Sequence, residues 1–582
     1  MRVGIGQINT KVGDIKGNMN KIKQYYDKFK NEYKGDILVF PELTVTGYPP
    51  EDLLYNLDFL NDVETEIVDF IKYTKNDNVL VILGAPIYDN GLLYNRALVI
   101  GNGRLYGQYS KQQLPNYSVF DEKRYFAEGK VNKLFYVNNH NLRFGVTICE
   151  DLWISTGPAN NLAKRGADII FNISASPYNL NKEYERLRML ETRASDISSY
   201  IVYANLVGGQ DELVFDGRSL IINPSGKLEH FGEKYKEELI VYDIDMDEAD
   251  LNNIKSLKKN KLVSNDYVDQ VFIDDIKFNK NKPKLEIPLR MNYNYFTSEI
   301  DNLWNSLVLG LRDYVYKNGF KKVVFGLSGG IDSALVAALA AEALGPENVL
   351  GIMMPSEYSS PESVTDSNEL IKNLGIKYEM TPIKAIYDVY MKAVIDVFSK
   401  KEFSVANENI QARIRGNIVM AYSNQFGYLP LATGNKSEMA VGYSTLYGDM
   451  VGGFAPIKDV YKTQVYKLAD YYNNVLKGYE AIPMNIIKKA PSAELKPGQI
   501  DQEKLPPYEV LDKILSLYID KNYSFNMIVQ RIGENYKEVV RDVLRMVDNN
   551  EFKRKQAPIG LKVSERVFGK DRRMPITNKY RA

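Results

Sequence analysis

The only cysteine of the 582-residue chain, Cys149, is the side chain best suited to act as a nucleophile. It ends the apolar run GVTIC, and two acidic residues follow it directly. A thiol is mostly protonated at neutral pH, so it reacts only with the help of a base and a nearby cation. The chain has only two histidines, His140 and His230, which makes a histidine base or histidine metal site a poor hypothesis. The partners of Cys149 are therefore expected among carboxylates and lysines.

Glu42 and Lys111 have positions that suit such a partnership. Glu42 lies in FPELTVTGYPP, directly after an apolar run, and Lys111 begins KQQLPNYSVFDEKRYF. Reactive groups of α/β folds often lie where strands end, because the loops there are free of sheet hydrogen bonding. Glu42 could take the thiol proton and later activate water, while Lys111 could stabilise the thiolate and an oxyanion. Each residue alone also has a structural interpretation: an inert buried thiol, a helix cap and a solvated lysine.

The context of these residues resembles the nitrilase (carbon–nitrogen hydrolase) superfamily. The resemblance rests on FPEL and CEDLW together, and it implies a Glu42–Lys111–Cys149 triad that releases ammonia from an amide through a thioester. It also implies that three residues hold a glutamine substrate: Tyr117, Ser176 and Lys182. A substrate with an ammonium and a carboxylate calls for such opposed polar groups. For Lys182, an ordinary turn with a solvated lysine stays an open alternative.

A glycine-rich loop, 328–333 with the sequence SGGIDS, lies between the apolar run VVFGL and an alanine-rich helical segment. Glycines let backbone amides wrap around phosphate oxygens, and the helix N-terminus adds its positive end. Asp332 would repel a bare phosphate, so we expect Mg²⁺ between them. The loop lacks the Gly-Lys-Ser/Thr ending of a Walker A motif and is not GxGxxG. A turn that caps the helix without any ligand is the structural alternative.

The loop resembles the PP-loop of ATP pyrophosphatases, which split ATP into AMP and pyrophosphate. Together with ENIQAR, TGNKSE, GYSTLYGD, YKT and PSAEL it resembles NAD synthetase over nearly all of residues 300–582. The implied ATP site comprises Gly326, Leu327, Ser328, Gly329, Gly330, Ile331, Asp332, Ser333, Thr433, Lys462 and Ser492. The implied deamido-NAD site comprises Asn409, Arg413, Glu438 and Lys553, with Asp332 and Glu438 as the Mg²⁺ ligands.

Some details of this second site stay open. Thr463, beside Lys462, is a further candidate for phosphate contact. Which of four cations touch deamido-NAD is undecided: Arg413, Arg415, Lys553 and Lys555. Leu446 stands where ammonia-dependent members of the family commonly have lysine, so that contact to the dinucleotide is not transferred.

Two α/β domains must position these groups. Residues 1–245 alternate β-rich and helical runs, and the nitrilase resemblance implies an α-β-β-α sandwich there. Residues 246–290 are rich in Asp, Asn and Lys, which predicts a connector with weak structure of its own, draped over a surface. Residues 291–582 show successive strand–helix units, which predict a Rossmann-like parallel sheet.

The bulk composition indicates which partners to expect. Lys plus Arg equals Asp plus Glu at 74 each, so the net charge calls for neither nucleic acid nor an anionic membrane. The basic segment KVSERVFGKDRRMPITNKYR could by itself be a nucleic-acid arm, whereas the resemblance implies a folded end of the domain. No stretch approaches the ~20 apolar residues needed to cross a bilayer, and the start lacks signal-peptide order. We expect a cytoplasmic homo-oligomer.

The order of the two halves resembles glutamine-dependent NAD synthetases. The resemblance implies that ATP adenylates the nicotinate carboxylate of deamido-NAD and that ammonia from glutamine then displaces AMP. Two alternatives remain open. One is an amidase whose C-terminal domain only binds a regulatory nucleotide. The other is a different PP-loop ligase, such as a tRNA-modifying one, for which a continuous basic surface would be expected.

Overall fold

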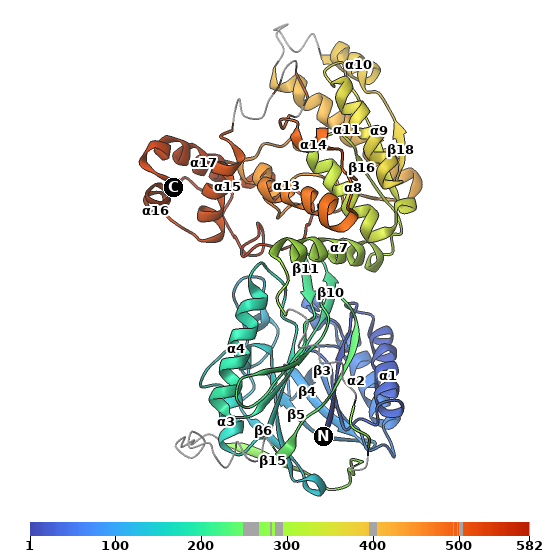
Figure 1. Ribbon diagram of the computed structural model, residues 1–582, viewed down its shortest axis with the longest axis vertical. Helices are drawn as coiled ribbons and strands as arrows, with labels where there is room; N and C mark the ends of the chain where they lie inside the picture. The colour runs from blue at the N-terminus through green and yellow to red at the C-terminus, as the bar shows by residue number, and fades with distance from the viewer. Residues whose placement is uncertain are drawn as a thin grey trace. The chain divides into compact units, whose positions relative to one another are not determined.

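The computed structural model describes residues 1–247, 267–279, 282–285, 295–394, 404–492, 494–496, 499 and 505–580. These residues belong to two units: Met1–Gln210 with Val214–Thr297, and Asp211–Leu213 with Ser298–Ala582 (Figure 1). Much of the predicted connector, namely 248–266, 280–281 and 286–290, lies outside the described residues.

Two β-sheets form the centre of the N-terminal unit. The first has the order β14-β1-β2-β3-β4-β5, and the second has the order β13-β12-β9-β8-β7-β6-β15. The strands of the first sheet are β1 Arg2–Gln7, β2 Ile37–Val39, β3 Leu80–Asp89, β4 Leu92–Gly101, β5 Arg104–Ser110 and β14 Glu238–Asp243. Those of the second are β6 Asn132–Val137, β7 Leu142–Ile148, β8 Ile169–Ser174, β9 Tyr200–Asn205, β12 Leu220–Ile222, β13 Leu228–Phe231 and β15 Val268–Ile273. A separate hairpin joins β10 Val207–Gln210 and β11 Leu213–Asp216.

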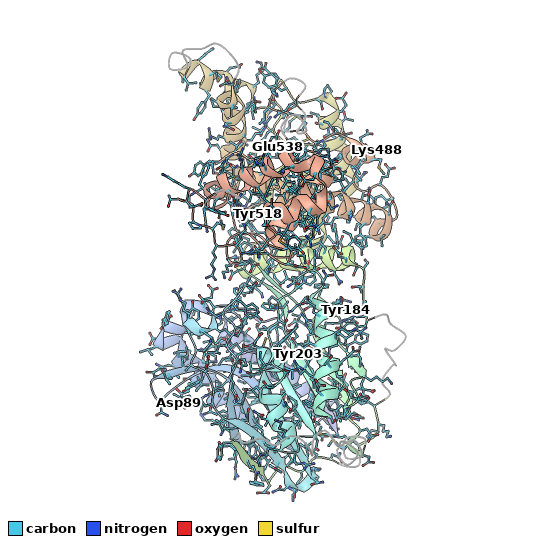
Figure 2. All side chains as sticks on the ribbon, turned by 90° about the vertical axis from the view of Figure 1, so that its left-hand side faces the viewer. Asp89, Tyr184, Tyr203, Lys488, Tyr518 and Glu538 are labelled. Atoms are coloured by element: carbon cyan, nitrogen blue, oxygen red, sulfur yellow. The ribbon has the colours of Figure 1, made fainter. Side chains whose placement is uncertain are left out.

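Apolar packing holds this unit in four layers. The inner faces of the two sheets share one core that includes Ile5, Ile82, Val146 and Phe171. Helices α1 (Ile15–Asn31) and α2 (Leu57–Tyr73) cover the outer face of the first sheet. Helices α3 (Pro158–Lys164) and α4 (Lys182–Ile197) cover the second, where Tyr203 is buried (Figure 2). The α-β-β-α sandwich predicted from the sequence is therefore confirmed.

Strand β15 differs from the prediction of weak structure in 246–290. It pairs in parallel with β6 over its whole length, from Val268 opposite Asn132 to Ile273 opposite Val137. Ile273 is fully buried, whereas Gln270 and Phe272 are exposed. The surrounding Asp and Lys residues concealed this short alternation of apolar and polar side chains, which is typical of an edge strand.

A four-stranded parallel sheet of the order β18-β17-β16-β19 lies at the centre of the C-terminal unit, as the sequence predicted. The strands are β16 Val323–Gly326, β17 Val349–Met353, β18 Lys377–Met380 and β19 Leu429–Pro430. The helices are α7 Glu299–Lys317, α8 Ile331–Leu344, α9 Pro361–Leu374, α10 Lys384–Val394, α11 Val405–Phe426, α12 Lys436–Val441, α13 Lys462–Tyr471, α14 Met484–Lys488, α15 Tyr508–Leu515, α16 Phe525–Ile532, α17 Lys537–Asn549 and α18 Glu551–Arg554. Among the described helices, none is long and apolar enough to span a membrane.

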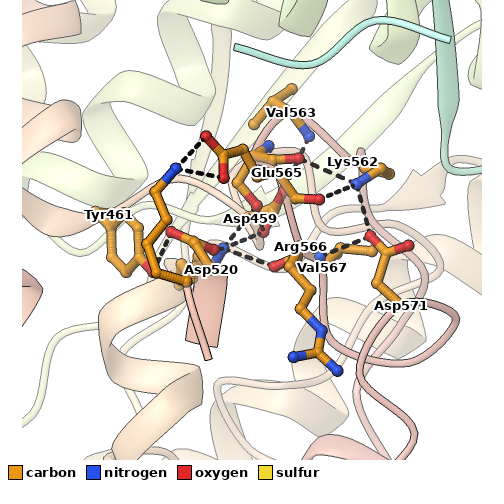
Figure 3. A network of polar contacts seen from close by, with 12 residues as sticks. Asp459, Tyr461, Asp520, Lys562, Val563, Glu565, Arg566, Val567 and Asp571 are labelled. Atoms are coloured by element: carbon orange, nitrogen blue, oxygen red, sulfur yellow. Dashed lines mark hydrogen bonds and ion pairs between the residues drawn. The ribbon is translucent and has the colours of Figure 1, made fainter. Parts of the chain in front are cut away.

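The basic tail is part of this folded unit. Lys562 donates to Asp571 at 2.6 Å and to the carbonyls of Ser564 and Glu565 (Figure 3). Lys436 of α12 is fully buried, and its ammonium contacts Asp459 and Asp520 at 2.9 Å each and the carbonyl of Arg566 at 3.0 Å. Buried cations need such partners, because an unpaired charge in the interior is strongly destabilising. The expectation of a folded domain end is confirmed.

We predict that Lys436→Met strongly destabilises the C-terminal unit. The substitution would leave Asp459 and Asp520 facing each other in the interior without their cation. Breaking a buried ion pair in this way costs about 3–5 kcal/mol. The measurement is urea unfolding followed by Trp304 fluorescence in a Trp153→Phe background, because these are the two tryptophans of the chain and Trp304 is buried in α7.

Lys521→Met is the matched control. Lys521 pairs with Glu565 at 2.6 Å beside the same network, but both side chains are more than a third exposed. Exposed pairs are worth less than about 1 kcal/mol. Equal losses in the two variants would contradict the structural role of Lys436.

Candidate active sites

The three residues of the predicted triad come together where strands of the two facing sheets end. Glu42 follows β2, Lys111 follows β5, and Cys149 follows β7 as the first residue of the short 3₁₀ helix η4 (Cys149–Leu152). The Lys111 ammonium donates to Glu42 Oε1 at 2.7 Å, and both side chains are fully buried. Cys149 is 5% exposed, and both of these charged groups shift the pKa of its thiol, Glu42 upward and Lys111 downward. The structure therefore forms one compact cluster from residues up to 107 positions apart in the sequence.

Glu42 is held in place by three donors. Besides Lys111, the Asn95 side chain donates to Oε1 at 2.8 Å, and the Ala175 backbone N–H donates to Oε2 at 3.1 Å. A carboxylate fixed in this way is pre-oriented, which is what a general base needs.

Glu122 is a fourth member of the cluster that the sequence analysis missed. Lys111 donates to Oε1 of Glu122 at 2.8 Å. The Tyr48 hydroxyl donates to the same oxygen at 3.0 Å. Burial raises the pKa of Glu122 to about 7, although Lys111 acts against this shift. Glu122 follows Lys111 by eleven positions in DEKRYF, but nothing in the sequence distinguishes it from the neighbouring Asp121.

The charge balance around the thiol includes a second carboxylate, Glu122, beside the predicted Glu42–Lys111 pair. Lys111 is shared by two carboxylates, and although burial lowers its pKa, Glu122 and Glu42 raise it well above the ordinary value. Burial raises the pKa of the Cys149 thiol, Glu42 raises it further, and Lys111 lowers it. A raised pKa means that the thiol holds its proton more firmly, so attack by the sulfur requires a base next to it that takes this proton.

The predicted glutamine contacts surround the same strand ends. Tyr117 donates through its hydroxyl to both Glu150 oxygens, at 3.1 and 3.0 Å. Ser176 is buried directly after Ala175, which contacts Glu42. Glu150, adjacent to Cys149, was not predicted; its position in CEDLW is the only sequence signal that could have found it.

Lys182 is partly buried, and it also pairs with the exposed Glu185 at 3.7 Å. It begins α4, and its ammonium lies 4.1 Å from the centre of the Trp153 ring. Its side chain is 23% exposed, and burial lowers its pKa, as does Arg186. A partly desolvated cation on an aromatic face suits an anionic substrate group.

The glycine-rich loop has the conformation that a phosphate-binding loop needs. Gly329 has φ +78°, and a Cβ there would lie 2.6 Å from the carbonyl oxygen of Ser363, so only glycine fits. The Ser333 hydroxyl accepts from the Ser328 N–H at 3.3 Å and lies 3.1 Å from the Ser328 hydroxyl. The loop runs from β16 directly into the N-terminus of α8, where backbone amides attract anions.

A cavity of about 550 Å³ opens at this loop. Every residue predicted for the ATP and deamido-NAD sites lines it: Gly326, Leu327, Ser328, Gly329, Gly330, Ile331, Asp332, Ser333, Asn409, Arg413, Thr433, Glu438, Lys462, Ser492 and Lys553. Arg415 also lines it, whereas Lys555 and Thr463 are not part of the described cavity wall. The Thr463 N–H instead donates to Asp512 at 2.8 Å, so its proposed contact to phosphate is not supported.

Asp332 and Glu438 converge on one cation, the ammonium of Lys462. Lys462 forms an ion pair with Asp332 and contacts Glu438 Oε1 at 3.2 Å. Asn435 donates to the other Asp332 oxygen at 2.8 Å. No cluster of three or more His, Cys, Asp or Glu side chains occurs in the described part of the chain. Two carboxylates beside a phosphate loop nevertheless fit Mg²⁺, which commonly takes one or two carboxylates together with substrate phosphates.

Three of the four predicted deamido-NAD residues form hydrogen bonds with the loop after α12. Asn409 accepts from the Thr445 hydroxyl at 2.9 Å, and Arg413 Nε donates to the Leu446 carbonyl at 3.1 Å. Lys553 donates to the carbonyls of Gly442 and Ser444 at 2.7 and 3.0 Å. Arg413 and Lys553 reach the cavity from helices α11 and α18 and bring positive charge to its wall.

Comparisons with known proteins identify the family of each half of the chain. The carbon–nitrogen hydrolase family matches residues 2–251, and the NAD synthase family matches residues 303–557. The chain is 46% identical over 581 residues to the glutamine-dependent NAD(+) synthetase of Aquifex aeolicus, with 100% of both chains covered. The chain belongs to the glutamine-dependent NAD(+) synthetase family. The family member from Thermotoga maritima is also 46% identical, over 100% of this chain and 99% of its own.

Solved structures of this synthetase family extend the likeness to the fold. The enzyme from Acinetobacter baumannii, in complex with adenosine diphosphate, is 36% identical, with 99% of this chain and 98% of that chain covered and a TM-score of 0.73. The enzyme from Cytophaga hutchinsonii has the same fold, with a TM-score of 0.79 at 22% identity and the same coverage.

Proposed function

We propose that this protein makes NAD from deamido-NAD, with glutamine as nitrogen donor and ATP as the source of activation. The observation that carries the proposal is the presence in one chain of a buried Glu–Lys–Cys cluster and a phosphate-loop cavity lined by all the residues expected for ATP and deamido-NAD. The names of the relatives that share the full length of the chain support it. We assign the amidase to residues 1–245 and the ligase to 291–582.

The first half of the reaction follows from the cluster. Cys149 attacks the side-chain amide of glutamine while Glu42 takes the thiol proton, and that proton passes to the leaving ammonia. Lys111, held by Glu42 and Glu122, stabilises the oxyanion of the tetrahedral intermediate. Water activated by Glu42 then hydrolyses the thioester to glutamate. Tyr117, Ser176 and Lys182 bind the glutamine.

The second half follows from the cavity. The amides and hydroxyls of loop 328–333 bind the ATP phosphates, with Thr433, Lys462 and Ser492 as further contacts. Asp332 and Glu438 would hold Mg²⁺, which supplies charge neutralisation at the phosphates when it is bound. Asn409, Arg413 and Lys553 hold deamido-NAD so that its carboxylate attacks the α-phosphate and releases pyrophosphate. Ammonia then displaces AMP from the adenylate.

One assay tests the whole proposal. Purified protein is supplied with glutamine labelled with ¹⁵N in the amide, ATP, Mg²⁺ and deamido-NAD. We expect NAD that carries ¹⁵N, together with AMP, pyrophosphate and glutamate, and no AMP when deamido-NAD is left out. Glutamate formed without NAD and AMP would identify an amidase with a regulatory nucleotide domain instead.

We also predict that the two nitrogen donors differ in their dependence on pH. Ammonium has a pKa in the range of amines, so less than about one per cent is free ammonia at pH 7. Ammonia that is released at Cys149 and used before it reaches bulk water avoids this protonation. Glutamine-driven NAD synthesis should therefore vary weakly between pH 7 and 9, apart from titration of the thiol. Synthesis from subsaturating ammonium chloride should rise about tenfold per pH unit, since the free base rises by that factor.

The measurement is a pair of pH profiles from one preparation. The Cys149→Ala variant serves as the control for the ammonium profile, because it removes any contribution from residual glutamine. Parallel profiles for both donors would show that ammonia equilibrates with solvent before it reacts.

A further inference from the structure

The carboxylate of Asp151 joins the two loops that carry Lys111 and Cys149. It is fully buried, two residues after Cys149 in η4. Its Oδ2 accepts from the Ile148 N–H at 3.0 Å and from the Tyr109 hydroxyl at 2.7 Å. Its Oδ1 accepts from the backbone N–H groups of Gln112 and Gln113, at 3.1 and 2.8 Å.

These donors flank both reacting groups. Ile148 directly precedes Cys149, Tyr109 is two residues before Lys111, and Gln112 directly follows Lys111. The loops leave different sheets, since β5 belongs to the first and β7 to the second. Cys149 has φ +44°, a left-handed conformation that a non-glycine residue keeps only where neighbouring contacts hold the turn.

We propose that Asp151 is a positioning residue of the glutaminase half, whose carboxylate sets the sulfur of Cys149 against Glu42 and Lys111 by binding both loops at once. This inference rests on the proposed glutaminase activity and adds a residue that does not itself touch the substrate.

Because of the donors around it, we expect that asparagine cannot replace Asp151 without a change in structure. Each carboxylate oxygen accepts from at least one backbone N–H, and a backbone N–H cannot turn around to become an acceptor. Whichever way an asparagine amide is oriented, its NH₂ group therefore faces a backbone donor. The conflict forces one of the two loops to move, and a displacement of about 1 Å can cost a hundredfold in rate.

The experiment compares Asp151→Asn with Asp168→Asn in the full-length protein. Asp168 is also a buried carboxylate bound to a backbone N–H, that of Arg143 at 3.0 Å, and to the Arg143 guanidinium at 3.0 Å. Asp168 directly precedes β8, whereas Cys149 directly follows β7. Because the two strands are parallel neighbours, Asp168 and Cys149 lie at opposite ends of these strands. Asp168→Asn therefore reports the general effect of losing a buried carboxylate.

For Asp151→Asn we expect kcat for glutamine hydrolysis to fall about a hundredfold, with KM changed less than about threefold. Alkylation of Cys149 by iodoacetamide, a neutral amide, should slow by a comparable factor, and Cys149 is the only thiol of the chain. Synthesis from ammonium chloride should stay at the parent rate. Tyr109→Phe, which removes one donor and leaves the backbone contacts, should have a much smaller effect.

Three outcomes would overturn the inference: parent-like kcat in Asp151→Asn, an unchanged alkylation rate, or equal losses of kcat in Asp151→Asn and Asp168→Asn. A parent protein that makes NAD from ammonium chloride but hydrolyses no glutamine would instead overturn the proposed glutaminase, and the role of Asp151 with it.

Discussion

Replacement of Cys149 by alanine is expected to abolish NAD synthesis from glutamine and to leave synthesis from ammonium chloride at the parent rate. The first effect is expected because the sulfur forms the thioester, and no other thiol exists in the chain. Loss of a covalent nucleophile lowers the rate by on the order of 10⁴-fold or more. The second effect is expected because the cavity at loop 328–333 contains no part of the amidase cluster.

The measurement is the initial rate of NAD formation with each donor, together with the rate of glutamate release. Alkylation of the parent enzyme with iodoacetamide should reproduce the loss, since the reagent can reach only one thiol. Because Cys149 is buried in the core shared by the two sheets, thermal unfolding of the variant is recorded as well. Glutamate release by Cys149→Ala would disprove the assignment of the nucleophile.

Replacement of Asp332 by asparagine is expected to stop the ligase with either donor. Asp332 is part of the phosphate loop 328–333 and lies in the first turn of α8. Asp332 and Glu438 both form ion pairs with the Lys462 ammonium. If these carboxylates hold Mg²⁺ against ATP, the variant loses charge neutralisation in the transition state. We expect formation of AMP and pyrophosphate to fall about a hundredfold or more.

A matched control separates this effect from a loss of stability. Asp313 is a buried carboxylate of α7 that does not line the cavity, so Asp313→Asn should keep the ligase activity. Glutamine hydrolysis should persist in Asp332→Asn, since Glu42, Lys111 and Cys149 are untouched. AMP formation at the parent rate in that variant would contradict the metal assignment.

Short-range patterns in the sequence determined much of the fold and the identity of the reacting groups. The apolar run before Cys149 predicted a strand that ends at the thiol, and β7 ends at Ile148. The SGGIDS loop lies between a strand and a helix, as predicted. This prediction was possible because the left-handed conformation of Gly329 and the start of the helix both depend on neighbouring residues. Such signals are local, so they can be recognised without knowledge of distant contacts.

Only the tertiary structure decided how these groups are partnered. Glu122 shares Lys111 with Glu42, although nothing in the sequence distinguishes it from Asp121. Asp151 binds the loops of two sheets, and the CEDLW motif does not show which groups it contacts. Lys462 is bound to Asp332, 130 positions away. Strand β15 is positioned by its pairing with the distant strand β6. The basic tail is positioned by its contact with Lys436. Burial and the electrostatic field at a residue depend on whichever segments pack against it, and the spacing of residues along the chain does not specify those segments.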